Sequence, residues 1–172
     1  MMANKLTLDD HLPYLLNRAG NLVIQLFSRD LAQWGLTVPM WRILAVLGER
    51  GPQRLVDLAV LTSIDVSTLS RTVGSMVRRG FVTRGVAPDN RREVVISLTT
   101  EGRKISTKPV PMAVRYEQSL TSGLSAKDLE ASKRVLKAVF ERLATQAGRS
   151  IPDTSPSRKS ASRRSSKPPA RK

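Results

Sequence analysis

The sequence predicts a mainly α-helical protein that carries one small β-hairpin. Three observations lead to this fold class. Long segments near both ends of residues 1–147 have apolar residues at helical spacing, two shorter helices are expected within residues 54–78, and β-branched residues cluster on either side of residues 85–92. A chain of 172 residues is long enough for one domain with its own core.

The expected terminal helices cover residues 8–32 and 126–147. In each of them the apolar residues form one stripe that is wider than a small central domain can cover. The stripes therefore predict either an intertwined two-fold dimer or helices that fold back onto their own core. Another long helix is expected over residues 99–122, where Pro109 and Pro111 are tolerated only as a bend or a break.

The most informative segment lies between these helices, at residues 65–84. Within it Val66, Leu69, Val73 and the pair Met76-Val77 fall at steps of three and four, so they are expected in the core. The opposite face has hydroxyl groups in its first turns and arginines further along: Ser67, Thr68, Ser70, Arg71, Ser75 and Arg78.

Both ends of this helix carry boundary signals. Asp65 is a suitable cap before the first turn, and Gly80 lies where a chain that leaves a helix needs a positive φ. A shorter helix is expected upstream at residues 54–61, followed by a tight turn. Two such helices form a helix-turn-helix unit, whose second helix docks in the major groove of DNA. The alternative is an ordinary surface helix with a solvated polar face.

A hairpin is expected directly after this unit. Its strands correspond to residues 81–84 and 93–98, and its long connection contains Arg91 and Arg92. A helix-turn-helix followed by a hairpin is a winged helix, in which these arginines would lie on the wing. Arginine suits the negative potential of a narrow minor groove, although two loop arginines can also be simply solvated.

The polar face has the chemistry that DNA binding requires. Hydroxyl groups near a helix N-terminus suit phosphate oxygens, because unpaired N–H groups and the helix dipole favour an anion there. Arg71 is the residue near that end that can donate two parallel hydrogen bonds to guanine O6 and N7, so we expect it to read bases. The expected DNA-binding residues are Ser67, Thr68, Ser70, Arg71, Ser75, Arg78, Arg91 and Arg92.

Five stretches resemble the MarR-type (multiple antibiotic resistance regulator) winged-helix transcription factors. They are GLTVPMWRIL (35–44), IDVSTLSR (64–71), GFVTR (80–84), PDNRR (88–92) and SLTTEGR (97–103), and their order and spacing make the match specific. The resemblance runs from about Leu12 to Ala147 and assigns DNA contacts to Ser67, Thr68 and Arg71 and to Arg92, with Arg91 beside it. The chain departs from the family at Asn90, where an aspartate usually steadies the wing, and Asp89 lies one residue earlier.

The resemblance also implies how such a protein works. It implies a homodimer that binds a palindromic operator, more often as a repressor than as an activator. Small aromatic or phenolic ligands bind family members between the dimerisation helices and the DNA-binding lobe. An arginine beside aromatic surface would suit an aromatic carboxylate, although Trp41 could instead be a core residue and His11 a surface one. The candidate ligand-binding residues are His11, Tyr14, Arg18, Trp41 and Arg42.

The charge of the chain agrees with a nucleic-acid partner. A formal net charge of +15 and a pI near 11.3 favour a polyanion. Residues 148–172 contain eight basic residues and one acidic residue in a Ser- and Pro-rich tail that we expect to be disordered. The tail is either an arm that adds phosphate contacts or a solubilising extension. If it dominates binding, the alternative function is a basic architectural nucleic-acid binder with little sequence specificity.

Several other classes of protein lack support in the sequence. The chain has no cysteine and a single histidine, His11, so thiol chemistry, a Ser-His-Asp site and a clustered zinc site lack the necessary residues. We therefore expect no enzyme activity, metal or cofactor. No signal-peptide pattern and no run of about twenty apolar residues occurs, and we expect a cytoplasmic protein on the nucleoid.

Overall fold

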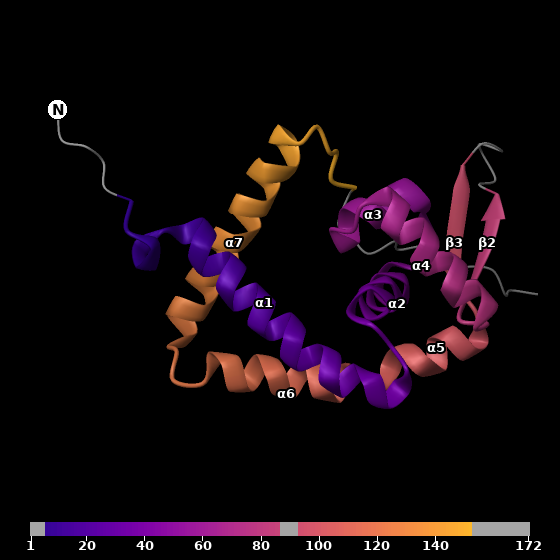
Figure 1. Ribbon diagram of the computed structural model, residues 1–172, viewed down its shortest axis with the longest axis horizontal. Helices are drawn as coiled ribbons and strands as arrows, with labels where there is room; N and C mark the ends of the chain where they lie inside the picture. Colours follow the sequence, from indigo (N-terminus) through magenta and orange to yellow (C-terminus); the bar gives the residue numbers. More distant parts are fainter. Residues whose placement is uncertain (1–5, 87–92, 153–172) are drawn as a thin grey trace, which may run out of the picture.

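The computed structural model describes residues 6–86 and 93–152 and arranges them in two groups of elements (Figure 1). One group is a lobe of helices with a small sheet, and the other contains the first helix and the last two helices of the chain. Two 3₁₀ turns, Leu8–Asp10 and Ala32–Trp34, flank the first helix. In chain order the remaining elements are α1 (Leu12–Leu31), α2 (Val38–Arg50), β1 (Gln53–Arg54), α3 (Leu55–Thr62), α4 (Val66–Arg78), β2 (Val82–Val86), β3 (Val94–Leu98), α5 (Thr100–Thr107), α6 (Val110–Thr121) and α7 (Ala126–Gln146).

The lobe of short helices is a winged helix, as the sequence predicted. Helices α3 and α4 form the helix-turn-helix, and β2 and β3 form the antiparallel hairpin, with Val82 opposite Leu98 and Val86 opposite Val94. The sequence did not predict β1, which pairs with β3 and makes the strand order β1-β3-β2. Two residues are too few to produce an alternating pattern, so only the long-range pairing defines this strand.

One core joins α2, α3, α4 and the sheet. Its centre consists of fully buried aliphatic side chains that come from each of these elements, and this shared burial fixes how the helices lie against one another. The residues with no exposed surface include Leu31, Ile43, Leu44, Leu58, Leu69, Val73, Met76 and Ile96.

The stripe expected in the core of α4 is narrower than the sequence suggested. Leu69, Val73 and Met76 are completely buried, but Val66 is 50% exposed and Val77 is 38% exposed. The expectation for these two valines was wrong. They lie on the flank of the helix that turns toward solvent, and the buried residues of α4 are Leu69, Val73 and Met76.

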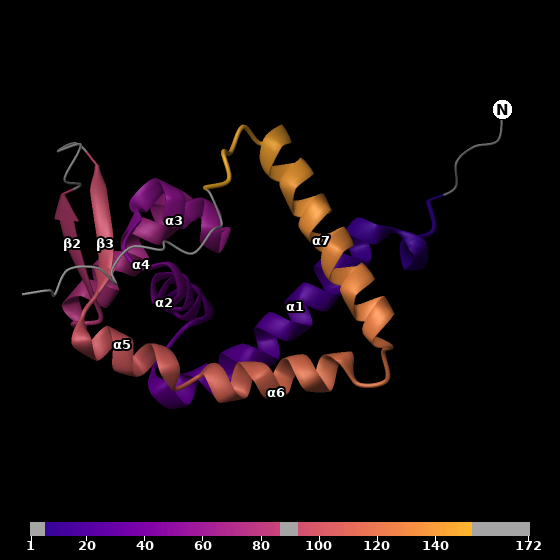
Figure 2. The same ribbon diagram turned by 180° about the vertical axis from the view of Figure 1, so that it is seen from behind.

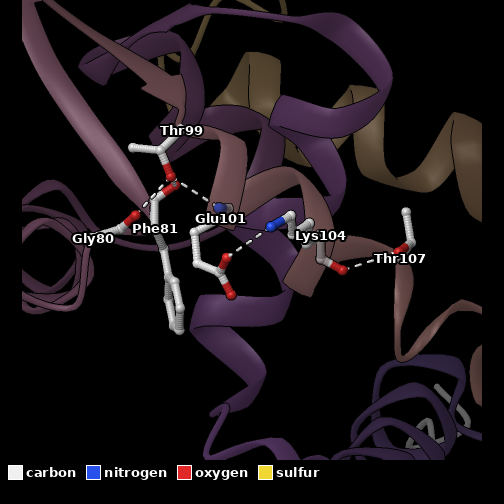
Figure 3. Close-up of polar contacts among 7 residues, drawn as sticks. Gly80, Phe81, Thr99, Glu101, Lys104 and Thr107 are labelled. Atoms are coloured by element: carbon white, nitrogen blue, oxygen red, sulfur yellow. Dashed lines mark hydrogen bonds and ion pairs between the residues drawn. The ribbon is translucent and has the colours of Figure 1, made fainter.

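Thr99 joins the wing to the helix that follows it (Figure 3). Its backbone N–H donates to the carbonyl of Phe81, and its hydroxyl lies 2.6 Å from the carbonyl oxygen of Gly80. The same oxygen caps α5 by accepting a hydrogen bond from Gly102 N at 2.9 Å. A Cβ at Gly102 would lie 1.9 Å from the carbonyl oxygen of Phe81, so only glycine permits this close contact between α5 and the end of α4.

Helices α1, α6 and α7 lie to one side of the winged helix (Figure 2). The prolines break the helix expected over residues 99–122 into α5 and α6, and Pro109 at the break is buried. Helix α6 contacts the end of α1, where Tyr116 Oη donates to Asp30 Oδ2 at 2.8 Å. Large parts of the predicted stripes in α1 and α7 remain exposed in the single chain: Leu12, Leu15, Leu22, Leu26, Val135, Leu136, Phe140 and Leu143.

Candidate nucleic-acid interface

The N-terminus of α4 is fixed by the side chain of Asp65. One of its oxygens, Oδ1, accepts hydrogen bonds from Thr68 N at 2.8 Å and from the Ser67 hydroxyl at 2.7 Å. These two donors stabilise the charged carboxylate and hold the pKa of Asp65 well below its ordinary value of 3.8, with the Ser67 hydroxyl as the larger cause. Because Ser67 donates its proton to Asp65, its oxygen remains available as an acceptor.

The C-terminus of α4 ends in a left-handed turn at Gly80, whose φ is 72°. Gly80 N donates to the carbonyl of Val77, and Phe81 N donates to the carbonyl of Met76 at 2.9 Å. This pair of hydrogen bonds is the Schellman motif, which satisfies two carbonyls that a helix end leaves unpaired. The cap and the glycine predicted from the sequence are therefore both confirmed.

The outer face of α4 presents the predicted hydroxyl groups and arginines to solvent. Ser67, Arg71 and Arg78 are exposed, whereas Thr68, Ser70 and Ser75 are partly buried along the flanks of the helix. Arg71 Nη2 lies 3.3 Å from Thr68 Oγ1, so its guanidinium is directed back toward the first turn. This is the end of the helix at which a recognition helix contacts base edges.

Arg84, which was not among the residues predicted to contact DNA, joins the wing to α4. It lies on β2, and its Nη2 donates to the Ser70 carbonyl at 3.0 Å and is 3.1 Å from the Ser70 hydroxyl. Arg84 and Ser70 are fourteen residues apart, so helical or strand spacing carries no signal for the contact. The wing strand and the recognition helix are consequently held in a defined relation.

Another arginine at the end of α4 is engaged within the protein. Arg79 Nη1 donates to the Gly35 carbonyl at 2.7 Å, and the guanidinium carbon lies 4.6 Å from the centre of the Phe81 ring. It therefore links the helix-turn-helix to the connection before α2. At the loop end of the hairpin, Arg54 Nε of β1 lies 2.7 Å from Glu93 Oε2, just before β3. The predicted wing contacts, Arg91 and Arg92, lie outside the described residues, as do Asp89 and Asn90.

A separate hollow of about 360 Å³ lies between α1, α2 and α6. Its walls include three aromatic side chains, of which Phe27 lies beside the other two, with ring centres 6.2 Å apart for Phe27 and Trp41 and 5.5 Å apart for Phe27 and Tyr116. Arg42 lines the same hollow and supplies a positive charge.

The five residues predicted to bind a ligand do not converge within the chain. Trp41 and Arg42 line the hollow, but His11, Tyr14 and Arg18 do not. These three residues lie in and before the first turns of α1, at the end away from the hollow, and the Arg18 guanidinium lies over the Tyr14 ring at 5.4 Å. Helical spacing correctly brings Tyr14 and Arg18 together, but it cannot indicate which end of a twenty-residue helix faces a cavity.

The described part of the chain holds neither a metal-ion cluster nor a membrane-spanning helix. Residues 6–86 and 93–152 contain no group of three or more His, Cys, Asp or Glu side chains that could hold a metal ion. Within the same ranges, no helix has the length and apolar character needed to cross a membrane.

Comparison with known proteins agrees with the winged-helix geometry. The profile of the MarR family matches residues 36–94. A MarR family transcriptional regulator from Silicibacter pomeroyi is 30% identical, with a TM-score of 0.68 over 81% of this chain and 99% of that one. The chain belongs to the MarR family.

Two further relatives are transcription regulators. BpsR of Bordetella bronchiseptica is 26% identical, with a TM-score of 0.71 over 79% of this chain and 97% of that one, and its structure concerns the regulation of its DNA binding by 6-hydroxynicotinic acid. The transcriptional repressor IacR of Pseudomonas putida is 26% identical over 77% of this chain and 79% of its own length. The chain is accordingly a MarR-family transcription regulator with a DNA-binding winged helix.

The cap at Asp65 leads to a prediction about acid stability. We expect Asp65→Ala to lower the stability of the protein at pH 7, because the first turn of α4 loses both of its acceptor bonds. The folded state lowers the pKa of this carboxyl, so its contribution is present above the ordinary value of 3.8 and disappears as pH falls further through the lowered value. Urea unfolding followed by circular dichroism at pH 7 and pH 3 measures the difference.

Asp9→Ala is the matched control, since it also removes one exposed carboxylate but does so before α1. The difference in free energy of unfolding between the wild type and Asp9→Ala should not shrink from pH 7 to pH 3 in the way expected for Asp65→Ala. If the wild type exceeds Asp65→Ala in free energy of unfolding by the same amount or more at pH 3 than at pH 7, the assignment of Asp65 as a charged cap is wrong.

Proposed function

We propose that this MarR-family chain is a homodimeric repressor that binds a palindromic DNA operator and is released from it by a small aromatic ligand. The observation that carries the proposal is the orientation of α4. Leu69, Val73 and Met76 are fully buried, so Ser67 and Arg71 face solvent from a helix that is fixed at both ends. A fixed, polar and accessible helix is what the major groove requires.

In this proposal Arg71 reads a guanine, and the surrounding side chains set the position of the helix on the duplex. Thr68 lies in the first turn, where its hydroxyl group can donate to a phosphate oxygen. Ser67, whose hydroxyl donates to Asp65, offers its oxygen as an acceptor to an amino group on a base edge. Ser75 and Arg78 would follow the DNA backbone further along, and Arg91 and Arg92 would enter the minor groove from the wing. Ser70 acts differently from the others, because its carbonyl and hydroxyl hold Arg84.

The dimer is proposed from the exposed apolar residues of α1 and α7. Leu22 is 58% exposed and Leu143 is 58% exposed, and each belongs to a stripe of similar residues on its helix. Monomeric soluble proteins rarely leave apolar stripes of this kind in water, and an interface with a second copy would cover them. A two-fold dimer would place two α4 helices about 34–36 Å apart, which is one turn of DNA.

The release by a ligand is proposed from the hollow between α1, α2 and α6. Its volume of about 360 Å³ is within the range of small-molecule sites, which are usually apolar with a few polar groups. The rings of Phe27, Trp41 and Tyr116 could hold an aromatic ring, and Arg42 could pair with its carboxylate. The relative BpsR, regulated by the aromatic acid 6-hydroxynicotinic acid, supports this ligand class. Binding there would act on the junction of α2 with α1 and α6.

The second candidate function is an architectural nucleic-acid binder, favoured by the net charge of +15. In that case phosphate contacts from the basic tail would supply most of the affinity, and base sequence would matter little. The two functions differ in what Arg71 and residues 149–172 contribute.

The proposed base reading predicts the effect of Arg71→Ala on specificity. The probes are a duplex selected by the full chain from a random-sequence pool and a scrambled duplex of the same composition. We expect the preference for the selected duplex to fall by about 1–3 kcal/mol, the usual contribution of one bidentate base contact, with most of the affinity for the scrambled duplex retained. Deleting residues 149–172 should mainly reduce the salt dependence of both affinities.

Arg115→Ala is the matched control, because it removes an exposed arginine of α6 rather than of α4. It should leave the preference unchanged. If Arg71→Ala also leaves the preference unchanged, the base-reading role is wrong. If the wild type shows no preference at all, the architectural function replaces the proposal.

The proposed dimer predicts a solution mass of twice the chain mass of 19.0 kDa. Leu143→Glu places a charge within the exposed stripe of α7, and we expect it to shift the mass measured by light scattering toward the monomer at low concentration. Lys137→Glu changes another α7 residue, which is not part of the apolar stripe, and serves as the control. A wild-type mass of 19.0 kDa at micromolar concentration would refute the dimer.

The proposed ligand site predicts that 6-hydroxynicotinic acid changes the fluorescence of Trp41, measured in a Trp34→Phe background so that a single tryptophan remains. Arg42→Ala should weaken this binding by about ten- to a hundredfold, since a charged hydrogen-bond partner is lost. Arg18→Ala should leave it unchanged, because Arg18 does not line the hollow. Equal affinities for the wild type and the Arg42 variant would exclude the proposed carboxylate contact.

A further inference from the structure

Gly74 lies midway along α4 and is partly exposed, beside the exposed Arg71 and Arg78. On a helix surface its neighbours are the residues three and four positions away, namely Ser70 and Arg71 before it and Val77 and Arg78 after it. The glycine therefore leaves bare backbone between two arginines of the proposed DNA-binding face. Because glycine is a poor helix former in such an interior position, a reason for its presence is required.

The fold itself supplies no such reason. A Cβ at Gly74 would meet only Arg78 Nη1, at 3.8 Å, which is an ordinary contact with the end of a flexible side chain. Gly102 shows what a structural requirement looks like, because a Cβ there would lie 1.9 Å from a backbone oxygen. Gly74 is also not among the glycines with a positive φ. Alanine would fit this position and would favour the helix.

We infer that Gly74 is the point at which DNA packs directly against the backbone of α4. This inference rests on the proposed function, because it requires α4 to enter the major groove. Without a side chain at position 74, the helix can approach the groove more closely, and the Arg71 guanidinium one turn earlier can reach guanine O6 and N7. Gly74 thus sets the depth of the recognition helix and, through that depth, the ability to discriminate sequence.

The experiment compares the full-length wild type with Gly74→Ala and Gly74→Leu. Both replacements are good helix formers, and they differ in the size of the group placed between helix and DNA. The matched control is Gly48→Ala in α2, where an added Cβ would also meet a single side-chain atom, Ser106 Oγ, at 3.8 Å. The measurements are the Tm and the affinities for the selected and scrambled duplexes described above.

We expect stability and binding to change in opposite directions. Gly74→Ala should raise the Tm by about 2–4 °C while weakening binding to the selected duplex by about tenfold or more, the scale of one lost base contact. Gly74→Leu should weaken this binding further. Affinity for the scrambled duplex should change much less, because phosphate contacts provide it. Gly48→Ala should not lower the Tm and should leave both affinities unchanged.

Two results would overturn the inference about Gly74 and leave the proposed function standing. One is a Gly74→Ala protein that binds the selected duplex as tightly as the wild type, and the other is a lower Tm for this variant, which would make the glycine a requirement of the fold. If the wild type and Gly48→Ala bind the selected and scrambled duplexes equally, the proposed function itself fails and the inference fails with it.

Discussion

The burial of Leu69, Val73 and Met76 is the interaction on which the rest of the structure depends. These side chains have no exposed surface, so they fix the rotation of α4 about its own axis. A rotation of one residue along the helix would bring polar groups into the core and leave them without partners, at a cost of about 1–3 kcal/mol for each group. The side of α4 that faces solvent, with Arg71 and Gly74, is therefore set by core packing.

The arginines in and around α4 fall into two groups, one bonded within the protein and one exposed to solvent. Arg79 and Arg84 use their guanidinium groups within the protein, where they hold α4 to the connection before α2 and to the wing. Arg71 and Arg78 remain exposed on the outer face. Arg79 and Arg84 thus hold α4 in place, and Arg71 and Arg78 remain accessible to a polyanion. A basic composition alone therefore does not identify the residues that contact DNA.

Local features of the sequence predicted much of this arrangement. The cap at Asp65, the left-handed Gly80 and the break at Pro109 each depend on neighbouring residues, and all three are present. The bond between Arg84 and Ser70, the short strand β1 and the exposure of Val66 depend on contacts between distant segments, for which periodicity carries no information. The same limit applies to the hollow, because the sequence cannot show that α1 presents Phe27 to Trp41 while Arg18 lies elsewhere.

The most direct test of the central claim, that two copies of α4 read base edges in the major groove, is methylation interference on the selected duplex with dimethyl sulfate. This reagent modifies guanine N7 in the major groove and adenine N3 in the minor groove. The account predicts that methylation of a guanine in each of two half-sites, about one helical turn apart, prevents binding. Unimpaired binding after guanine methylation, or interference confined to adenine N3, would contradict it.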